Sequence, residues 1–264
     1  MILLGTAALC LTGSCGRRIA FEGKPEPEPV VIAHRGSSAE APENSLPAFR
    51  QAILEGADWI ELDVHQTKDG VAVAAHDADL NRLAGVDARI WELTFAQLQQ
   101  YSVGAGCSGD YGDVRIPALE EVLRLCRGRV KLNIELKPTG HEQNLERQVA
   151  GLVSDYGMTE DCVLACQDAA CLETAKRLAP ELETLYVTAA PDAAVWQAAY
   201  VDSVSVSSGA ADADLLESVH QSGKKLYIWT VNDAQEMKRW MLAGADGIIT
   251  DKPGEALRVR DGLS

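Results

Sequence analysis

Short apolar segments with strand character alternate with helical patterns along most of the chain. The strand-like segments lie near residues 30–34, 58–64, 130–136, 161–166, 183–187, 201–206, 225–230 and 246–250. Between most of them apolar residues recur at helical spacing, for example over 45–55, 142–156, 169–178, 212–222 and 234–243. Eight strands alternating with helices over about 235 residues predict an α/β fold of the TIM type, a (β/α)8 barrel.

A doubly wound open sheet would give a similar alternation of strands and helices. However, no Gly-x-Gly-x-x-Gly pattern follows the first expected strand, so the usual dinucleotide-binding signature is missing from the sequence. The pattern therefore favours the barrel, in which functional residues gather at the carboxyl ends of the strands.

A turn signal, Thr67-Lys68-Asp69-Gly70, interrupts the alternation and is followed at once by a short apolar run over 71–75. This predicts a hairpin where a crossover helix would otherwise stand. With the turn centred near residue 69, Asp63 lies opposite Ala75 or His76. The returning strand is therefore expected to bring His76 back to the strand end that carries Asp63.

Residues 79–115, which follow the hairpin, show no strong periodicity. A short helix over 93–101 and a Gly-rich loop over 104–112 are expected within them. A loop insertion of this length at the active-site end of a barrel suits a lid or a substrate wall better than a separate folded domain.

The chain begins with an apolar segment, Met1–Ser14, followed by Cys15 and a linker rich in Glu and Pro. About 14 apolar residues are too few to span a bilayer but fit the centre of a signal peptide. Residues 12–15 loosely resemble the box before the lipid-bearing cysteine of bacterial lipoproteins, although position 12 is Thr and no Lys or Arg precedes the apolar run.

Residues 1–29 are therefore expected to be a signal or lipid anchor with its linker, and residues 30–264 to be the barrel domain. Such a protein would be secreted or held at the membrane as a lipoprotein outside the cytoplasm. A cytoplasmic chain with a frayed terminus and a membrane-embedded fragment are the alternatives.

The composition is that of a globular protein, and it is acidic. Thirty-nine Asp and Glu against 24 Lys and Arg give a net charge of −15, and no basic patch is evident, so nucleic acid is not expected as a partner. Cys162, Cys166 and Cys171 fall in an apolar strand and the helix after it. They are expected to be buried thiols rather than metal ligands.

Three carboxylates lie in or at the end of apolar strands, where ionised groups seldom stay unpaired. Glu61 and Asp63 alternate along one strand and so project to the same face, and Glu135 ends the next barrel strand. Carboxylates at one rim repel each other unless a cation neutralises them. Oxygen ligands suit a hard cation, so we expect one divalent ion, Mg²⁺ or Ca²⁺, at this trio.

Two histidines and two cationic residues are expected at the same rim. His34 and His76 end strands there, and a pair titrating near neutrality can serve as general acid and base. Arg35 and Lys137 supply positive charge that suits a phosphate group. The combination of acids, histidines and cations suggests a metal site beside a phosphate site.

The motifs that contain these residues occur in a fixed order with characteristic gaps. They are His34-Arg35-Gly36, Pro42-Glu43-Asn44-Ser45, Glu61-Leu62-Asp63-Val64, Asp69-Gly70, His76-Asp77, Glu135-Leu136-Lys137, Ile228–Asn232 and Gly244–Pro253. This order resembles the glycerophosphodiester phosphodiesterase family, and the match runs from about Val30 to Pro253. Each motif alone is weak evidence, whereas five in order are specific.

The resemblance implies a TIM-type barrel and metal-dependent hydrolysis of glycerophosphodiesters to sn-glycerol 3-phosphate and an alcohol. It suggests that the glycerol hydroxyl attacks first and gives a cyclic phosphate, while direct attack by water stays open. The roles that it implies are metal binding by Glu61, Asp63 and Glu135, acid–base catalysis by His34 and His76, and phosphate binding by Arg35 and Lys137.

Several residues have roles that the sequence leaves open. Asn44 would contact substrate or cap the helix that begins near Ser45. Trp229 ends the seventh strand, where the resemblance places an aromatic beside the glycerol moiety, and Asp251 would orient a neighbour or cap the last helix. His65 shares the face of the acids but lies further out in the hairpin, outside the expected catalytic set. Packing roles are expected for Trp59, Trp91, Trp196 and Trp240, and surface positions for His141 and His220.

Two other functions compete with this interpretation. A phosphodiesterase of the same fold that acts on lysophospholipids or sphingolipids would be favoured by an apolar guiding surface, and residues 79–115 are not notably apolar. A degenerate barrel that only binds a ligand would lack a histidine or a carboxylate, and none is lost. The alcohol headgroup, the cation, the oligomeric state and the division of labour between the histidines stay open.

Overall fold

The computed structural model describes residues 28–104 and 109–263 of the 264-residue chain. The apolar segment 1–14, Cys15 and the linker up to residue 27 lie outside the described residues. No helix within the described part of the chain has the length and apolar character needed to cross a membrane.

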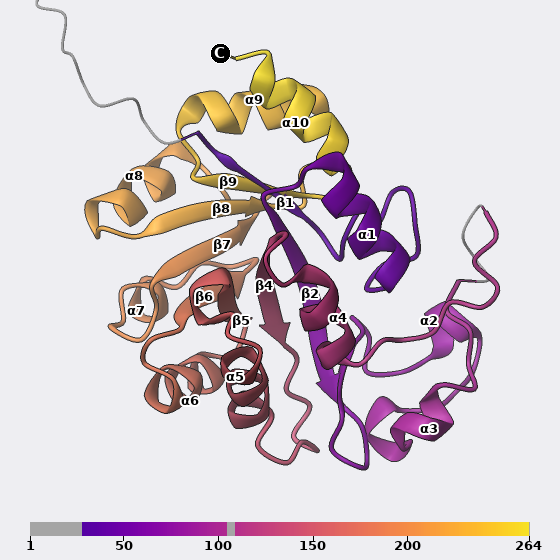
Figure 1. Ribbon diagram of the computed structural model, residues 1–264. Coiled ribbons are helices and arrows are strands. Elements are labelled where there is room, and N and C mark those ends of the chain that lie inside the picture. The colour runs from indigo at the N-terminus through magenta and orange to yellow at the C-terminus, as the bar shows by residue number, and fades with distance from the viewer. Residues whose placement is uncertain (1–27, 105–108, 264) are drawn as a thin grey trace, which may run out of the picture.

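Eight parallel strands form a closed barrel (Figure 1). Each strand pairs with the next in chain order, and β1 pairs with both β2 and β9, which closes the sheet. The strands are β1 (Val30–Ala33), β2 (Trp59–Gln66), β4 (Lys131–Leu136), β5 (Cys162–Cys166), β6 (Glu183–Thr188), β7 (Ser203–Ser207), β8 (Lys225–Trp229) and β9 (Gly247–Thr250). The TIM-type barrel predicted from the alternation is confirmed.

A helix follows each barrel strand and packs on the outside of the sheet (Figure 1). These helices are α1 (Leu46–Glu55), α4 (Leu119–Cys126), α5 (Leu145–Asp155), α6 (Ala169–Leu178), α7 (Ala193–Trp196), α8 (Ala213–Gln221), α9 (Ala234–Ala243) and α10 (Pro253–Asp261). Asp168, Asp212 and Asp233 cap α6, α8 and α9 with side-chain oxygens that accept from free backbone N–H groups.

The hairpin after β2 is present and has the expected register. β3 (Ala72–Ala74) pairs antiparallel with the far end of β2, with Val64 opposite Ala74. The backbone N–H of Ala75 donates to the carbonyl of Asp63 at 3.0 Å. His76 therefore follows the return strand at the level of Asp63, as the turn position predicts.

The insertion after the hairpin is a packed extension of the barrel. It contains α2 (Asn81–Ala84), a 3₁₀ turn η1 (Ile90–Glu92) and α3 (Phe95–Leu98), which is shorter than the helix expected over 93–101. It has a small apolar core made of Val73, Ala75, Leu80, Ile90, Leu98, Val103 and Ile116. Because two of these residues belong to the hairpin, the insertion is held against the strand that delivers His76.

Apolar residues fill the barrel below its carboxyl end, as in the packed cores typical of this fold. The inner cluster consists of Ile32, Val163, Ala165, Leu185, Val187, Tyr227 and Ile249. Cys162, Cys166 and Cys171 are buried and unpaired, as expected, and burial raises the pKa of Cys162 to about 12.

The tryptophans divide between core and surface. Trp196 and Trp240 are buried, and Trp59 packs against the inner cluster, in agreement with the expected packing roles. Trp91 is half-buried and stacks on the ring of exposed His141, with the ring centroids 4.5 Å apart.

Candidate active site

The turn after β1 places His34 and Arg35 at the mouth of the barrel. Arg35 and Gly36 have φ of 56° and 84°, and a Cβ at Gly36 would lie 2.7 Å from the backbone of Ala48. Only glycine therefore allows α1 to pack this close to the strand end. In this turn the backbone N–H of Arg35 donates to the carboxylate of Glu61 at 2.8 Å.

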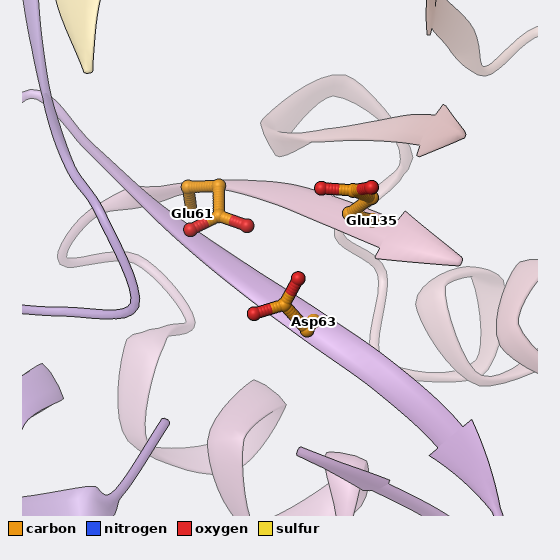
Figure 2. A group of neighbouring side chains, drawn as sticks. All are labelled: Glu61, Asp63 and Glu135. Atoms are coloured by element: carbon orange, nitrogen blue, oxygen red, sulfur yellow. The ribbon is translucent and has the colours of Figure 1, made fainter. Parts of the chain in front are cut away.

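The three predicted carboxylates converge on one point at the carboxyl end of the barrel (Figure 2). Glu61 and Asp63 lie on one face of β2, and Glu135 lies opposite Asp63 on the neighbouring strand β4. All three are buried, and their ligand oxygens lie within 4.8 Å of one another. Close, buried oxygen donors of this kind suit a hard divalent cation.

The pKa values of Glu61 and Asp63 are shifted in opposite directions. Burial and the charge of Asp63 raise the pKa of Glu61 to about 8. Burial also acts to raise the pKa of Asp63, but Lys137 and Arg35 outweigh it and lower that pKa. With no cation bound, Glu61 would therefore hold a proton near neutral pH. Two buried neighbouring acids of this kind form an environment that favours a bound cation.

Lys137 connects two of the acids. Its Nζ lies 3.0 Å from Asp63 and 2.7 Å from Glu135. Burial opposes the charge of Lys137, but the two carboxylates outweigh it and raise the pKa of the ammonium group. Gln167 also donates to Glu135, at 3.2 Å. A permanent positive charge therefore stands beside the carboxylate trio.

His34 is held by Asp251. Its Nδ1 lies 2.7 Å from Asp251, whose other oxygen accepts from Asn232 at 2.6 Å. Burial, the largest influence, lowers the pKa of His34, but the hydrogen bond to Asp251 and the charge of Glu61 outweigh it and raise the pKa overall. Of the two roles weighed for Asp251, orientation of a neighbour is the one that the structure shows, and Nε2 of His34 remains for proton exchange.

His76 is held in the same manner by the residue that follows it. Its Nδ1 lies 2.7 Å from Asp77. Behind it, buried His65 contacts the backbone carbonyl of His76 through Nε2 at 3.1 Å, and burial lowers the pKa of His65. The two strand-end histidines are thus both fixed through Nδ1 by an aspartate.

One pocket at the barrel mouth contains nearly all the predicted residues. Its charged and polar lining includes His34, Arg35, Glu61, Asp63, His76, Glu135, Lys137 and Gln167. Its apolar lining is formed by Val187, Trp229 and Ile249. The indole N–H of Trp229 donates to the carbonyl of Ser205 at 3.2 Å, which fixes the plane of the ring. The pocket therefore has an ionic side for a phosphate and an apolar side for a small carbon skeleton.

Asn44 lies behind this pocket. It is buried, its amide donates to the Asp63 carboxylate at 2.8 Å, and its Oδ1 accepts from the Asp63 backbone N–H at 3.1 Å. The capping role is wrong, because Ser45 is the residue that caps α1. Asn44 therefore holds Asp63 in place from behind. Asp63 lines the pocket and Asn44 does not.

Sequence reasoning assigned no role to several of the supporting residues. Asp77, Glu43 and Gln167 contact His76, Arg35 and Glu135, respectively. Asp77 and Glu43 were visible only as members of family-like motifs. Gln167 had no signal, because its contact depends on two strands 32 positions apart in the sequence.

The chain matches one protein family over most of its length. Residues 34–255 match the model of the glycerophosphoryl diester phosphodiesterase family. The glycerophosphodiester phosphodiesterase of Caldanaerobacter subterraneus is 32% identical over 229 residues, which cover 85% of this chain and 94% of that protein.

Solved structures resemble the barrel closely. A structure from Silicibacter pomeroyi, assigned to the glycerophosphoryl diester phosphodiesterases, has a TM-score of 0.82 at 27% identity, and the match covers 90% of this chain and 95% of the other. A phosphodiesterase from Oleispira antarctica, in complex with the product sn-glycerol-3-phosphate, has a TM-score of 0.80 at 27% identity. That match covers 89% of this chain and 97% of the other.

Proposed function

Because the chain belongs to the glycerophosphoryl diester phosphodiesterase family, we propose that it hydrolyses glycerophosphodiesters to sn-glycerol 3-phosphate and an alcohol. The convergence of three carboxylates, two histidines and two cationic side chains on one pocket is the observation that carries this function. The product complex of the Oleispira antarctica relative supports the same reaction.

The charged residues of the pocket have distinct tasks. Arg35 and Lys137 bind the phosphate and stabilise the negative charge that develops on it. Glu61, Asp63 and Glu135 hold one divalent cation, Mg²⁺ or Ca²⁺, which would neutralise phosphate oxygens when bound. Trp229 packs against the glycerol carbons from the apolar side. Asn44, proposed from the sequence as a substrate contact, acts instead by fixing Asp63.

His34 and His76 divide the proton transfers. One takes the proton from the attacking hydroxyl, and the other gives a proton to the oxygen of the departing alcohol. The glycerol hydroxyl next to the phosphoester is the first nucleophile, because a group on the same molecule gains from proximity. Its attack on phosphorus expels the alcohol and closes a cyclic phosphate. Water then opens the ring to give sn-glycerol 3-phosphate.

We expect turnover of glycerophosphocholine, glycerophosphoethanolamine and glycerophosphoglycerol, with release of sn-glycerol 3-phosphate in each case. Among the described residues, the apolar side of the pocket comprises three side chains, and a surface of this size fits a glycerol skeleton. The purified protein is assayed with each diester and each cation in a reaction coupled to glycerol-3-phosphate dehydrogenase. Lysophosphatidylcholine is the comparison substrate. Its cleavage would give lysophosphatidic acid and choline, so its turnover is followed by choline release, and turnover of it alone would establish the lipid-directed alternative.

A separate proposal concerns the localisation of the protein and rests on its N-terminal residues. The apolar run before Cys15 supports export and acylation of that cysteine, which would tether the barrel to a membrane outside the cytoplasm. Cells that express the chain are labelled with radioactive palmitate. Label is expected on the wild-type chain and not on the Cys15→Ser variant, whereas equal labelling of both would exclude this anchor.

A further inference from the structure

Arg82, in the insertion helix α2, lies between the two loops that carry catalytic groups. Its Nη1 and Nη2 donate to the two oxygens of Glu43 at 2.7 Å and 2.8 Å, and its Nε donates to Asp77 at 2.6 Å. The guanidinium thus uses three of its donors on two carboxylates that come from different loops.

Both of these carboxylates touch proposed active-site residues. Asp77 accepts from Nδ1 of His76, and Glu43 accepts from Nη1 of Arg35 at 2.9 Å. Arg35 in turn lies 3.3 Å from Asp63 through its Nε. An unbroken series of contacts therefore runs from the His76 imidazole through Arg82 to the guanidinium of Arg35.

We propose that Arg82 is a positioning residue, which sets the orientation of His76 through Asp77 and that of Arg35 through Glu43. The insertion then has a specific task, namely to bring a fixed guanidinium to the point where the segment after β3 and the β1–α1 loop meet. This inference rests on the proposed phosphodiesterase function and adds to it a residue that does not line the pocket.

The charges of the network agree with this role. Burial acts to raise the pKa of both Glu43 and Asp77, but Arg82 and the other partners of each carboxyl outweigh it and lower both values. Two ionised carboxylates that share one cation hold a defined geometry, because the planar fork of arginine fixes the direction of each hydrogen bond. A lysine could supply the charge but not the fork.

The same network contributes little to folding. The side chain of Arg82 is 48% exposed, and ion pairs at such sites add at most about 1 kcal/mol to stability. Arg89 offers a matched control in the same insertion. It is 42% exposed and pairs with Asp79 at 2.6 Å. Loss of either arginine is therefore expected to cost a similar, small amount of stability.

The test compares Arg82→Met, Arg82→Lys and Arg89→Met with the wild type in glycerophosphodiester hydrolysis. For Arg82→Met we expect kcat to fall about 10- to 100-fold, the size of loss seen when a residue that orients a metal ligand is removed. Arg82→Lys should lie between Arg82→Met and the wild type, and it gives a second variant that retains the charge. Arg89→Met should turn over at the wild-type rate, and thermal unfolding midpoints should stay close together throughout.

A double variant shows whether Arg82 acts through Asp77. If it does, Arg82→Met combined with Asp77→Asn should lose less activity than the product of the two single losses, because the part that passes through Asp77 is lost only once. Multiplied losses, a wild-type kcat for Arg82→Met, or an equal fall in Arg89→Met would overturn the inference. Inactivity of the wild-type enzyme on every glycerophosphodiester would instead reject the proposed function itself.

Discussion

Replacing either His34 or His76 by alanine is expected to lower kcat by roughly 10²- to 10⁴-fold, the range that general acid–base groups contribute. Each imidazole is fixed by an aspartate at Nδ1, so in the proposed mechanism its Nε2 is the atom that exchanges a proton with the substrate. The two side chains are 16% and 35% exposed, and their removal leaves no large cavity in the core. The variants should therefore remain folded while turnover is lost.

His220 is a matched control for this experiment. It is an exposed histidine on α8 that also pairs with an aspartate, Asp246, at 2.8 Å. The three variants His34→Ala, His76→Ala and His220→Ala are compared by steady-state kinetics and thermal unfolding. His220→Ala should keep wild-type kinetics. Near wild-type turnover by either of the other two would refute the acid–base assignment.

Removal of divalent cations by a chelator is expected to abolish activity, and addition of Mg²⁺ or Ca²⁺ should restore it. The reason is the crowding of Glu61, Asp63 and Glu135, whose oxygens approach within 4.8 Å in a buried setting. Burial and the neighbouring charge of Asp63 raise the pKa of Glu61, so a cation relieves a repulsion that folding creates.

A single substitution tests whether the loss of activity on chelation arises at the three carboxylates. Glu135→Gln should raise the cation concentration needed for half-maximal activity. The increase should exceed the roughly 10- to 100-fold loss of affinity that follows removal of a residue that contacts a metal ligand but not the metal. The matched exchange Glu236→Gln removes an exposed carboxylate on α9 that pairs with Arg239, and it should leave the cation requirement unchanged. Full activity in the presence of chelator would remove the metal from the mechanism.

Much of the site was predictable because the relevant signals are local. Alternation along a strand puts Glu61 and Asp63 on one face whatever surrounds them. The turn at Asp69 determines which residues of the hairpin oppose each other, and that places His76 level with Asp63. The glycine after Arg35 marks a backbone conformation that the turn requires.

The supporting contacts were not predictable in the same way. Asp251 was expected to orient a neighbour or to cap a helix, but the sequence did not say which neighbour, because it reaches His34 across 217 positions. Arg82 reaches Glu43 across 39 positions. Each contact depends on barrel closure or on the packing of the insertion, and neither leaves a periodic trace in the sequence. Asn44 shows the same limit, since neither of its expected roles, substrate contact or helix capping, involved Asp63, which lies on β2, 19 positions away.

By itself, the sequence determined the barrel, the order of its motifs and the residue types that meet at its mouth, because strand and helix periods and turn chemistry depend on near neighbours. Only the tertiary structure decided which side chain holds which: aspartates at both imidazoles, Asn44 behind Asp63, and Arg82 between the two catalytic loops. These choices follow from distances between segments that are remote in the chain, and those distances exist only once the sheet has closed and the insertion has packed against it.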